Sequence, residues 1–581
     1  MFALPRSSWA DYDSSLISEG GGVFARTLKS IPITPQMRTA LGISGNVEAM
    51  APAELITACL KAPVDLLWNG GIGTYVKSTL ESNSQVGDKA NDGLRINGAE
   101  LRAKCVGEGG NLGLTQLGRV EYAGRGGRIN TDFIDNSAGV DTSDHEVNIK
   151  ILLASEVAAG RLTTADRDAF LASMTDEVAQ LVLANNYEQN LALANSVHQS
   201  VSMAGVHEDW MDRLVDGGLL DRKLEFLPAT EDMESRRSNH RGLTAPELAV
   251  LMAYTKIVLE DVITASELPD DPYLADRLIS YFPTAMRERY ADVMPQHRLH
   301  REIIATVVVN QFVNSSGITC FHRLSGETGA AAPDVIRAQI AARALFGADK
   351  LDAAIQALDH HIDAQMQTVL RMEVRTLVER ATRWLVNNRR RPIDIQAAVD
   401  QLQAGVQRVQ QQLPSVLCGR ELEVYDKRLQ TYRGAGVSDE LASAIAGLPP
   451  AYAALAIVQT ANRDDRDPLE VAEVHFIVGQ RLGLDRLLSR IVELPRDDRW
   501  QTMARAALRD DMHAVHAQLT ADVMASGNSR SARDMVASWE RHIPAVADSV
   551  KTLRSICASR PDLARMSVGL RIVRALLPTA G

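Results

Sequence analysis

Three glycine-bearing clusters in the early part of the chain decide its fold. They read Asp65-Leu-Leu-Trp-Asn-Gly-Gly-Ile-Gly73, Lys104-Cys-Val-Gly-Glu-Gly-Gly-Asn111 and Arg128-Ile-Asn-Thr-Asp-Phe-Ile-Asp-Asn-Ser-Ala-Gly139. In each, a short apolar run is followed by Gly and Asn, which is typical of a buried strand that ends at a ligand crevice. Glycine leaves the backbone bare, so a dinucleotide can come close to it. The pattern therefore predicts short parallel strands with a nucleotide site beyond their carboxyl ends.

Helical patterns separate these apolar runs. We expect helices at 52–61 and 98–104, and one that starts near Ser143 and runs past Leu153. We expect strands at 64–68, 105–106 and 131–134. Strands that alternate with helices favour a parallel sheet, with helices packed on its faces.

After about residue 155 nearly every pattern is helical. Thr244-Ala-Pro-Glu247 reads as a capping box that opens an apolar helix, and Ser438 reads as the cap of another helix. The predicted fold class is α/β followed by mostly α, with a partial Rossmann-like parallel sheet and a large helical C-terminal region. We divide it into a half dinucleotide-binding domain at 1–155, a helical region at 156–330 that packs on it, and a helical C-terminal domain at 331–581.

Composition narrows the classes of partner. The 581 residues carry a net charge of −11, which disfavours binding to nucleic-acid phosphates. The five cysteines are scattered, so we expect reduced thiols in the cytoplasm and neither a disulfide framework nor a metal site. No apolar run approaches the ~18 residues that suggest a membrane span, so we expect no membrane partner.

Longer stretches resemble a known family. They are Leu4-Pro-Arg-Ser-Ser-Trp-Ala-Asp-Tyr12, Trp68-Asn-Gly-Gly-Ile-Gly-Thr-Tyr-Val-Lys77, Val106-Gly-Glu-Gly-Gly-Asn-Leu-Gly-Leu-Thr-Gln116, Asp135-Asn-Ser-Ala-Gly-Val-Asp-Thr-Ser-Asp-His-Glu146 and Gly242-Leu-Thr-Ala-Pro-Glu-Leu-Ala-Val250. The chain resembles the large-subunit, NAD-specific glutamate dehydrogenases of bacteria over essentially its whole length. The resemblance implies NAD-dependent oxidative deamination of L-glutamate to 2-oxoglutarate and ammonium, by a homo-oligomer.

The resemblance also indicates what this sequence does not contain. In that family the dinucleotide fingerprint, the catalytic Lys and the catalytic Asp lie before the point that matches the start of this chain. We therefore expect a fragment of a longer enzyme that supplies NAD contacts and one substrate contact but no turnover of its own. We assign no catalytic residue.

The same resemblance implies five cofactor contacts. Asn69, Gly70 and Gly71 correspond to NAD contacts at the end of the first strand, Asn111 lies near the nicotinamide ribose, and Asn136 orients the carboxamide. Each has a plainer alternative. The first three could be a tight turn that needs glycine at positive φ, Asn111 an Asx-turn, and Asn136 a loop residue at a helix entry.

Ser143 lies seven positions after Asn136, where the related enzymes place a serine that binds the substrate side-chain carboxylate. A hydroxyl at a helix N-terminus suits an anion. Ser143 also fits an ordinary N-cap, with Glu146 completing a capping box. Asp141, Asp144 and Glu146 make the surroundings acidic, so a dicarboxylate would need cations from elsewhere.

The other polar residues favour ordinary structural roles. His145 is a possible acid or base, but most lone histidines are structural or solvated. We interpret the pairs His297/His300 and His360/His361 as surface, because neither has a third ligand at zinc spacing. Lys77 and Lys89 could meet phosphate but are more often solvated.

Two other functions remain open at this point. The helical bulk could be an assembly or regulatory module without catalysis of its own. A dehydrogenase for a different amino acid is a third reading, against which Ser143 argues because its hydroxyl suits an acidic side chain.

Overall fold

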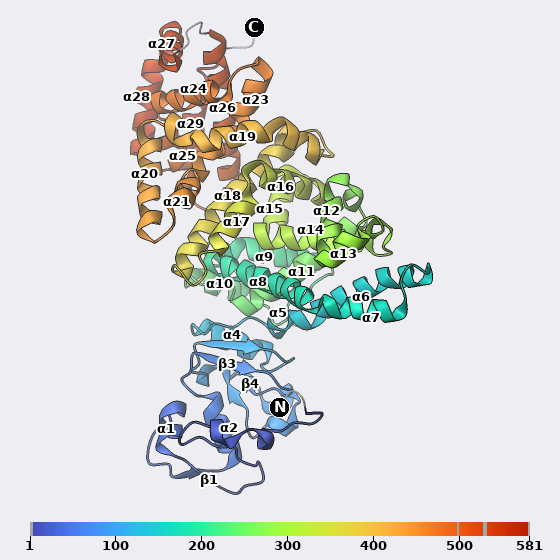
Figure 1. Ribbon diagram of the computed structural model, residues 1–581. Coiled ribbons are helices and arrows are strands. Elements are labelled where there is room, and N and C mark those ends of the chain that lie inside the picture. The colour runs from blue at the N-terminus through green and yellow to red at the C-terminus, as the bar shows by residue number, and fades with distance from the viewer. Residues whose placement is uncertain (1–3, 497–498, 527–530, 579–581) are drawn as a thin grey trace. The chain divides into compact units, whose positions relative to one another are not determined.

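The computed structural model describes residues 4–496, 499–526 and 531–578 (Figure 1). Its contacts divide the chain into two compact units. The first unit comprises Met1–Ala204, Met211–Tyr254 and Ile279–Leu299, and the second comprises Gly205–Trp210, Thr255–Leu278 and His300–Gly581.

Within the described residues, the strands all lie in the first unit and form three two-stranded sheets. The sheets pair β1 (Ile31–Pro32) antiparallel with β2 (Ala49–Met50), β3 (Leu66–Asn69) parallel with β6 (Cys105–Glu108), and β4 (Val76–Lys77) parallel with β5 (Ile96–Asn97). The fold is therefore mostly helical, with small parallel sheets at the glycine-bearing clusters.

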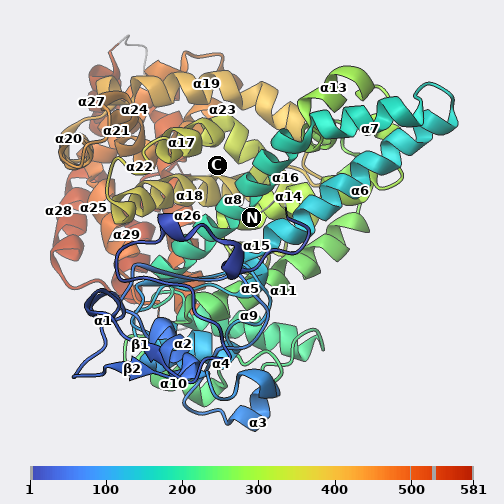
Figure 2. The ribbon, with the colours of Figure 1, turned by 60° about the horizontal axis from the view of Figure 1, so that its bottom comes forward.

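A small apolar core holds β3 to β6 together. Val76, Ile96, Val106 and Leu114 are each about 2% exposed or less, and they pack with Tyr122. The Tyr122 hydroxyl donates to the Ala103 carbonyl at 2.7 Å. A second small core contains Ile31 of β1, Ile33 and Leu55 of α2. Figure 2 shows α2 next to β1 and β2.

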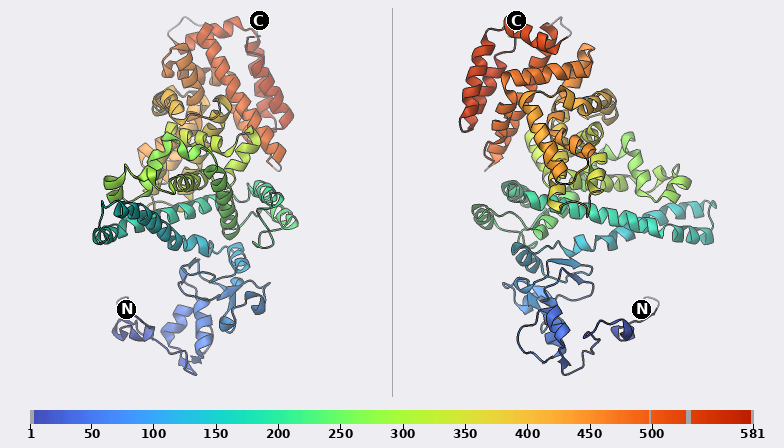
Figure 3. Two further views of the ribbon diagram at one scale, coloured as in Figure 1. Left: turned by 90° about the vertical axis from the view of Figure 1, so that its right-hand side faces the viewer. Right: turned by 60° about the vertical axis from the view of Figure 1, so that its left-hand side comes forward.

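The helices of the first unit include two long ones, α6 and α8, which lie side by side (cyan and teal in Figure 3). Three helices, α9, α11 and α12, have residues in both units. The helix bounds up to residue 299 are α1 Pro35–Leu41, α2 Pro52–Leu60, α3 Asn83–Val86, α4 Gln116–Gly124, α5 Asp132–Asp135, α6 Ser137–Ala158, α7 Thr164–Ser173, α8 Thr175–Gln199, α9 Ala204–Asp216, α10 Thr230–Ser238, α11 Ala245–Thr264, α12 Ala275–Tyr281 and α13 Thr284–Tyr290. The 3-10 turns of the first unit are Trp9–Asp11, Ser14–Leu16, Lys89–Asn91, Gly98–Glu100 and Met294–Gln296, and those of the second unit are Leu268–Asp270 and Pro272–Leu274.

The described part of the second unit is helical. Its bounds are α14 His300–Ser316, α15 Cys320–Thr328, α16 Ala332–Phe346, α17 Ala348–Gln356, α18 Ala364–Asn388, α19 Ile395–Val416, α20 Gly419–Gly434, α21 Asp439–Ala446, α22 Leu448–Ala451, α23 Ala454–Asp464, α24 Pro468–Leu482, α25 Leu484–Val492, α26 Arg499–Ser526, α27 Ala532–His542, α28 Ala545–Ala558 and α29 Leu563–Arg574.

Several local predictions are confirmed. Pro52 begins α2, and the Ser438 hydroxyl caps α21 by accepting from the Leu441 N–H. Before α11, the Glu247 carboxylate accepts from the Thr244 N–H at 2.7 Å, as the capping box predicts. The Thr244 hydroxyl also donates to Glu247 instead of capping a backbone N–H.

Two local predictions are wrong. The run at 131–134 is not a strand, because Asp132–Asp135 forms the short helix α5. Just before this run, Arg128 forms a single parallel bridge with Cys105 of β6. The expected helix at 98–104 is only the 3-10 turn Gly98–Glu100. Tertiary contacts of Asp132 and Asp135, described below, override the strand-like pattern of this segment.

Within the described residues, no single helix is long and apolar enough to cross a membrane. Two bent pairs reach that length and composition only when their helices are taken together: His300–Ser316 with Cys320–Thr328, and Asp439–Ala446 with Leu448–Asp464.

Candidate functional site

The carboxyl ends of β3 and β6 meet in register, with Asn69 opposite Glu108. The Asn69 carbonyl accepts from the N–H groups of Gly109, at 2.9 Å, and Gly110, at 3.2 Å. A Cβ built on Gly110 would lie 2.8 Å from the Gly71 carbonyl oxygen. The loops after the two strands therefore approach each other so closely that only a bare backbone fits.

Two predicted amides meet at this edge. The Asn136 side chain donates from Nδ2 to Asn111 Oδ1 at 3.1 Å. Among the described residues, neither Asn136 Oδ1 nor Asn111 Nδ2 has a hydrogen bond, so an acceptor oxygen and a donor NH₂ group are left over. The structure thus gathers Asn69, Gly71, Asn111 and Asn136 along one edge, which we call the amide rim.

The plainer alternative holds for Asn136, which lies at the entry of α6, but not for the two glycines or for Asn111. Gly70 and Gly71 do not have positive φ, whereas Gly73 does, at 124°. Asn111 bonds another side chain and not its own backbone. Asn136 occupies the cap position before α6, but its side chain makes no cap hydrogen bond there.

A buried ion-pair network behind the amide rim was missed by sequence reasoning. Glu108 is 0% exposed and receives two hydrogen bonds from Arg119, from Nε at 2.7 Å and from Nη2 at 3.0 Å. Glu108 also accepts from the Leu114 N–H, while Asp132 pairs with Arg119 at 3.1 Å and accepts from the Leu112 N–H. These bonds fix both ends of the loop that carries Asn111.

The two partners of the central ion pair shift differently: burial raises the pKa of Glu108, although Arg119 and the Leu114 N–H oppose the shift. Burial disfavours the charge on Arg119, but the ion pairs with Glu108 and Asp132 outweigh burial and raise the pKa of Arg119 above its usual range. The sequence contains one signal of this network: Glu108 ends a buried strand, and a buried carboxylate needs a partner. Its partner, eleven residues further on in α4, could not be identified from spacing.

Asparagines of α8 hold the start of α6. Asn186 donates from Nδ2 to the Ile134 carbonyl at 2.8 Å and to Ser137 Oγ at 2.9 Å. Asn190 accepts from Asn130 Nδ2 at 2.5 Å, and the same Asn130 nitrogen lies 3.2 Å from Asp135 Oδ1. The backbone that carries Asn136 is therefore braced from a helix some fifty residues away in sequence.

Trp68 covers Gly107 of β6 and Gly109, which follows the strand. A Cβ on Gly107 would lie 2.7 Å from the indole, and one on Gly109 2.5 Å from it. The indole is nevertheless 59% exposed, and Gly70 and Gly71 beside it are exposed. An exposed aromatic face therefore lies on bare backbone next to the amide rim.

The expectation that Ser143 begins a helix is wrong. Helix α6 begins at Ser137, so Ser143 lies inside it, exposed, and Glu146 pairs with Lys150 instead of forming a capping box. The N-terminal N–H groups that suit an anion are thus not beside Ser143. Seven residues are close to two helical turns, so Ser143 shares a face with Asn136, roughly 10 Å along the axis.

The histidines near α6 are buried. His145 is 2% exposed and stacks on Tyr281, with ring centroids 4.3 Å apart, and its Nε2 lies 3.7 Å from Asp141. Burial lowers the pKa of His145, although Asp141 and Asp144 oppose the shift. The prediction of a surface pair is wrong for His297, which is 4% exposed and bonds the Asn148 carbonyl at 3.0 Å.

The two lysines lie in ordinary settings. Lys77 donates from Nζ to Asn97 Oδ1 at 2.5 Å and to the Ser78 carbonyl at 3.1 Å, so its ammonium is already engaged. Lys89 lies in the 3-10 turn Lys89–Asn91. The phosphate contact considered for these lysines gains no support.

Comparison with known proteins gives matches along most of the chain. Residues 1–196 match the family model "Bacterial NAD-glutamate dehydrogenase, catalytic domain", and residues 240–575 match "Glutamate dehydrogenase, C-terminal".

Curated relatives match at similar levels. A protein of Mycobacterium tuberculosis named NAD-specific glutamate dehydrogenase is 44% identical over 100% of this chain and 36% of its own length. Proteins of the same name from Pseudomonas aeruginosa and Halomonas elongata are 45% and 44% identical, over 94% and 93% of this chain and 34% and 33% of their own lengths. The chain thus spans about a third of the length of these relatives.

Proposed function

This chain belongs to the bacterial NAD-glutamate dehydrogenase family, and we propose that it supplies the nicotinamide-facing part of the active site in the NAD-dependent oxidative deamination of L-glutamate. The products are 2-oxoglutarate and ammonium. In this proposal β3 and β6 belong to a Rossmann-like sheet in residues 1–155, and residues 156–330 and 331–581 form the helical parts of a homo-oligomer.

The amide rim is the observation that carries the proposal. A carboxamide presents a donor group and an acceptor in one plane. Among the described residues, the rim offers an acceptor without a hydrogen bond, Asn136 Oδ1, and a donor group without one, Asn111 Nδ2. The bare backbone at Gly70, Gly71 and Gly110 would let a flat ring and its ribose lie against the strand ends. The residues present therefore fit a nicotinamide cofactor.

Each group has a task in this arrangement. NAD, when bound, accepts the hydride from the substrate α-carbon. Asn136 and Asn111 would hold the carboxamide and so decide which face of the ring meets the substrate. The ion pair of Glu108 and Arg119 fixes the loop that presents Asn111, and Asn69 holds Gly109 and Gly110 through its carbonyl.

Ser143 is proposed as the contact for the substrate side-chain carboxylate. It lies on the Asn136 face of α6, two turns along the helix, and it is exposed. Asp141, Asp144 and Glu146 surround it with negative charge, so a glutamate would need cationic side chains from outside this stretch.

We propose that the chain alone does not turn over glutamate. Water activation and proton transfer need a general base and acid within reach of the α-carbon. Lys77, the lysine of β4, is engaged by Asn97 and Ser78. Glutamate-dependent NADH formation by the isolated chain would contradict this part of the proposal.

Calorimetry of the 581-residue chain with NAD tests the cofactor contact. We expect a binding signal that weakens roughly tenfold in Asn136→Ala, because one charge-neutral hydrogen bond to the carboxamide is lost. Asn46→Ala is the matched control, since Asn46 is exposed and far along the chain from the amide rim. Equal affinity in Asn136→Ala and Asn46→Ala would contradict the assignment.

The same titration separates the alternative function. A helical assembly or regulatory module without catalysis would show no NAD binding to the folded chain. Circular dichroism at the concentration used for calorimetry distinguishes that outcome from misfolding.

A further inference from the structure

Helices α9, α15 and α18 meet at a cluster of polar side chains in the second unit. Asp209 of α9 lies 2.6 Å from the His322 imidazole of α15, and Trp210 of α9 contacts the same ring, so these two helices pack together. Arg323 of α15 donates to both oxygens of Glu379 of α18, at 2.6 and 2.7 Å. All of these residues belong to the second unit.

Arg375 lies at this junction, one helical turn before Glu379 on α18, and it has no anionic partner of its own. A Cβ built on Gly317, between α14 and α15, would lie 1.9 Å from Arg375 Nη2, so the guanidinium rests directly on bare backbone. Both oxygens of Glu379 are already bound to Arg323. Among the described residues, Arg375 makes no hydrogen bond and no ion pair.

The charges at this junction do not cancel. Arg383, which lies 3.7 Å from Glu379, has a closer carboxylate in Glu327, at 2.5 Å. Glu379 therefore faces both Arg323 and Arg375, which leaves an excess of one positive charge. Burial lowers the pKa of Arg375; Glu379 opposes this shift and the charge of Arg323 adds to it. A buried charge without a partner is costly, so an anion from outside the chain would stabilise this junction.

Two buried polar atoms near Arg375 lack a hydrogen-bond partner in the part of the chain that the structure describes. They are Nδ1 of His207, a residue of α9 that is 3% exposed, and Nε of Arg323. Burial, together with the charges of Arg375 and Arg323, lowers the pKa of His207 to about 3, so the ring is neutral at physiological pH. A neutral imidazole can donate from Nδ1 without adding charge. Buried donors are nearly always paired, so these two atoms also point to an acceptor that the chain does not supply.

We propose that Arg375, Arg323 and His207 bind one chloride ion at the junction of α9, α15 and α18. A single negative charge balances the excess of one positive charge, whereas a phosphate would overshoot it. A spherical anion accepts hydrogen bonds from donors on three helices without a fixed geometry. The site lies far along the chain from the amide rim and does not depend on the cofactor assignment.

Chloride-35 NMR of the full chain tests the proposal, because a bound chloride that exchanges with the solution broadens the resonance of the bulk ion. We expect this broadening to be removed by bromide, which competes, and not by gluconate, whose anion is too large for a buried site. Arg375→Met should weaken chloride binding roughly tenfold or more, because a charge-assisted hydrogen bond is lost. His207→Phe should weaken it less, because the lost donor is neutral. Arg408→Met removes a half-exposed guanidinium that pairs with Asp467, and it should leave the broadening as in the parent.

Thermal unfolding by circular dichroism separates anion binding from a purely structural role of Arg375. Replacing gluconate by chloride at constant ionic strength should raise the unfolding midpoint of the parent by about 2 °C and leave that of Arg375→Met unchanged. In gluconate, Arg375→Met should be at least as stable as the parent, because it removes an uncompensated buried charge. The proposal is overturned if the parent does not broaden the chloride resonance, if Arg375→Met broadens it as the parent does, or if Arg375→Met in gluconate unfolds below the parent.

Discussion

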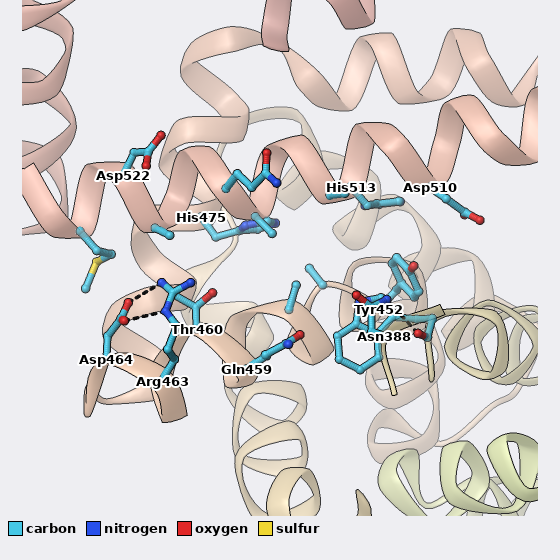
Figure 4. Close-up of a pocket in the computed structure, with 18 of the residues that line it drawn as sticks. Asn388, Tyr452, Gln459, Thr460, Arg463, Asp464, His475, Asp510, His513 and Asp522 are labelled. Atoms are coloured by element: carbon cyan, nitrogen blue, oxygen red, sulfur yellow. Dashed lines mark hydrogen bonds and ion pairs between the residues drawn. The ribbon is translucent and has the colours of Figure 1, made fainter. Parts of the chain in front are cut away.

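The amide rim of the first unit and a cleft between α23 and α26 of the second unit (Figure 4) treat buried polar groups in opposite ways. Behind the rim, Glu108, Arg119 and Asp132 satisfy one another and the backbone of one loop. At that cleft, Oδ2 of Asp522 and Nε2 of His513 have no hydrogen-bond partner among the described residues. Where short strands bury little apolar surface, ion pairs fix the backbone; where long helices bury a large core, the molecule tolerates an unfilled space.

The apolar cores differ in the same sense. The core around β3 and β6 contains few residues, such as Val76 and Val106, and its strands are only two to four residues long. The second unit buries whole helix faces, such as Leu484, Leu487 and Ile491 of α25. Polar contacts should therefore control stability in the first unit more than in the second.

The largest expected effect on the free energy of unfolding comes from breaking the ion pair between Glu108 and Arg119 in the first unit. Arg119→Met should lower the free energy of unfolding by about 3–5 kcal/mol, because Glu108 would stay buried without a partner. Urea unfolding measures it. Arg125→Met, at the exposed end of α4, is the control, and the double variant Glu108→Gln/Arg119→Met should recover most of the loss. A loss below about 1 kcal/mol in Arg119→Met would remove the distinction between the units.

A pH-dependent loss of stability is expected next, in the second unit. Burial lowers the pKa of His516 from 6.5 to about 4. The unfolded chain then binds more protons than the folded chain between these values, so stability falls as the pH drops from 6.5 to 4. One such histidine accounts for up to about 3 kcal/mol over that interval.

Urea unfolding at pH 7 and pH 5 measures this dependence. His516→Gln keeps a polar side chain but removes the titration, so the difference between the two pH values should shrink. His240→Gln, at an exposed position, should leave the difference unchanged. An unchanged difference in His516→Gln would show that His516 is not held neutral by burial.

A smaller effect on the free energy of unfolding is expected when a single methyl group is removed from the helical core. Ile491→Val should cost about 1 kcal/mol, since Ile491 is 0% exposed but surrounded by a large core that can adjust. Thermal unfolding followed by circular dichroism gives the value. A cost above that of Arg119→Met would reverse the proposed order of the two units.

The smallest effect is expected at Ser143. Ser143→Ala should change the free energy of unfolding by less than about 0.5 kcal/mol, because the hydroxyl is exposed and caps no helix. A cost near 1 kcal/mol, typical of a lost cap, would mean that the helix begins near Ser143 in solution.

Local sequence patterns identified the strand ends and most helices, but not the contacts that fix them. Glycine after apolar residues located the ends of β3 and β6, and Pro52 and Ser438 located helix starts. Ser143 with Glu146 imitates a capping box, although α6 had already begun at Ser137.

The remaining misses come from contacts over long sequence separation. Thr131–Ile134 has strand-like residues, but Asp132 is drawn to Arg119 and Asp135 accepts from the Glu108 N–H. The support of α6 by Asn186 of α8 likewise joins residues far apart in the chain. Spacing along one sequence carries no information about such pairs.

The space beside Gly113 restricts how this part of the protein can change. A Cβ on Gly113 would lie 1.7 Å from Asn69 Nδ2, so even alanine at 113 requires the asparagine to leave its place. The two positions, forty-four residues apart, are thus coupled: a side chain at 113 requires Asn69 to turn its amide away or to be replaced by a smaller residue.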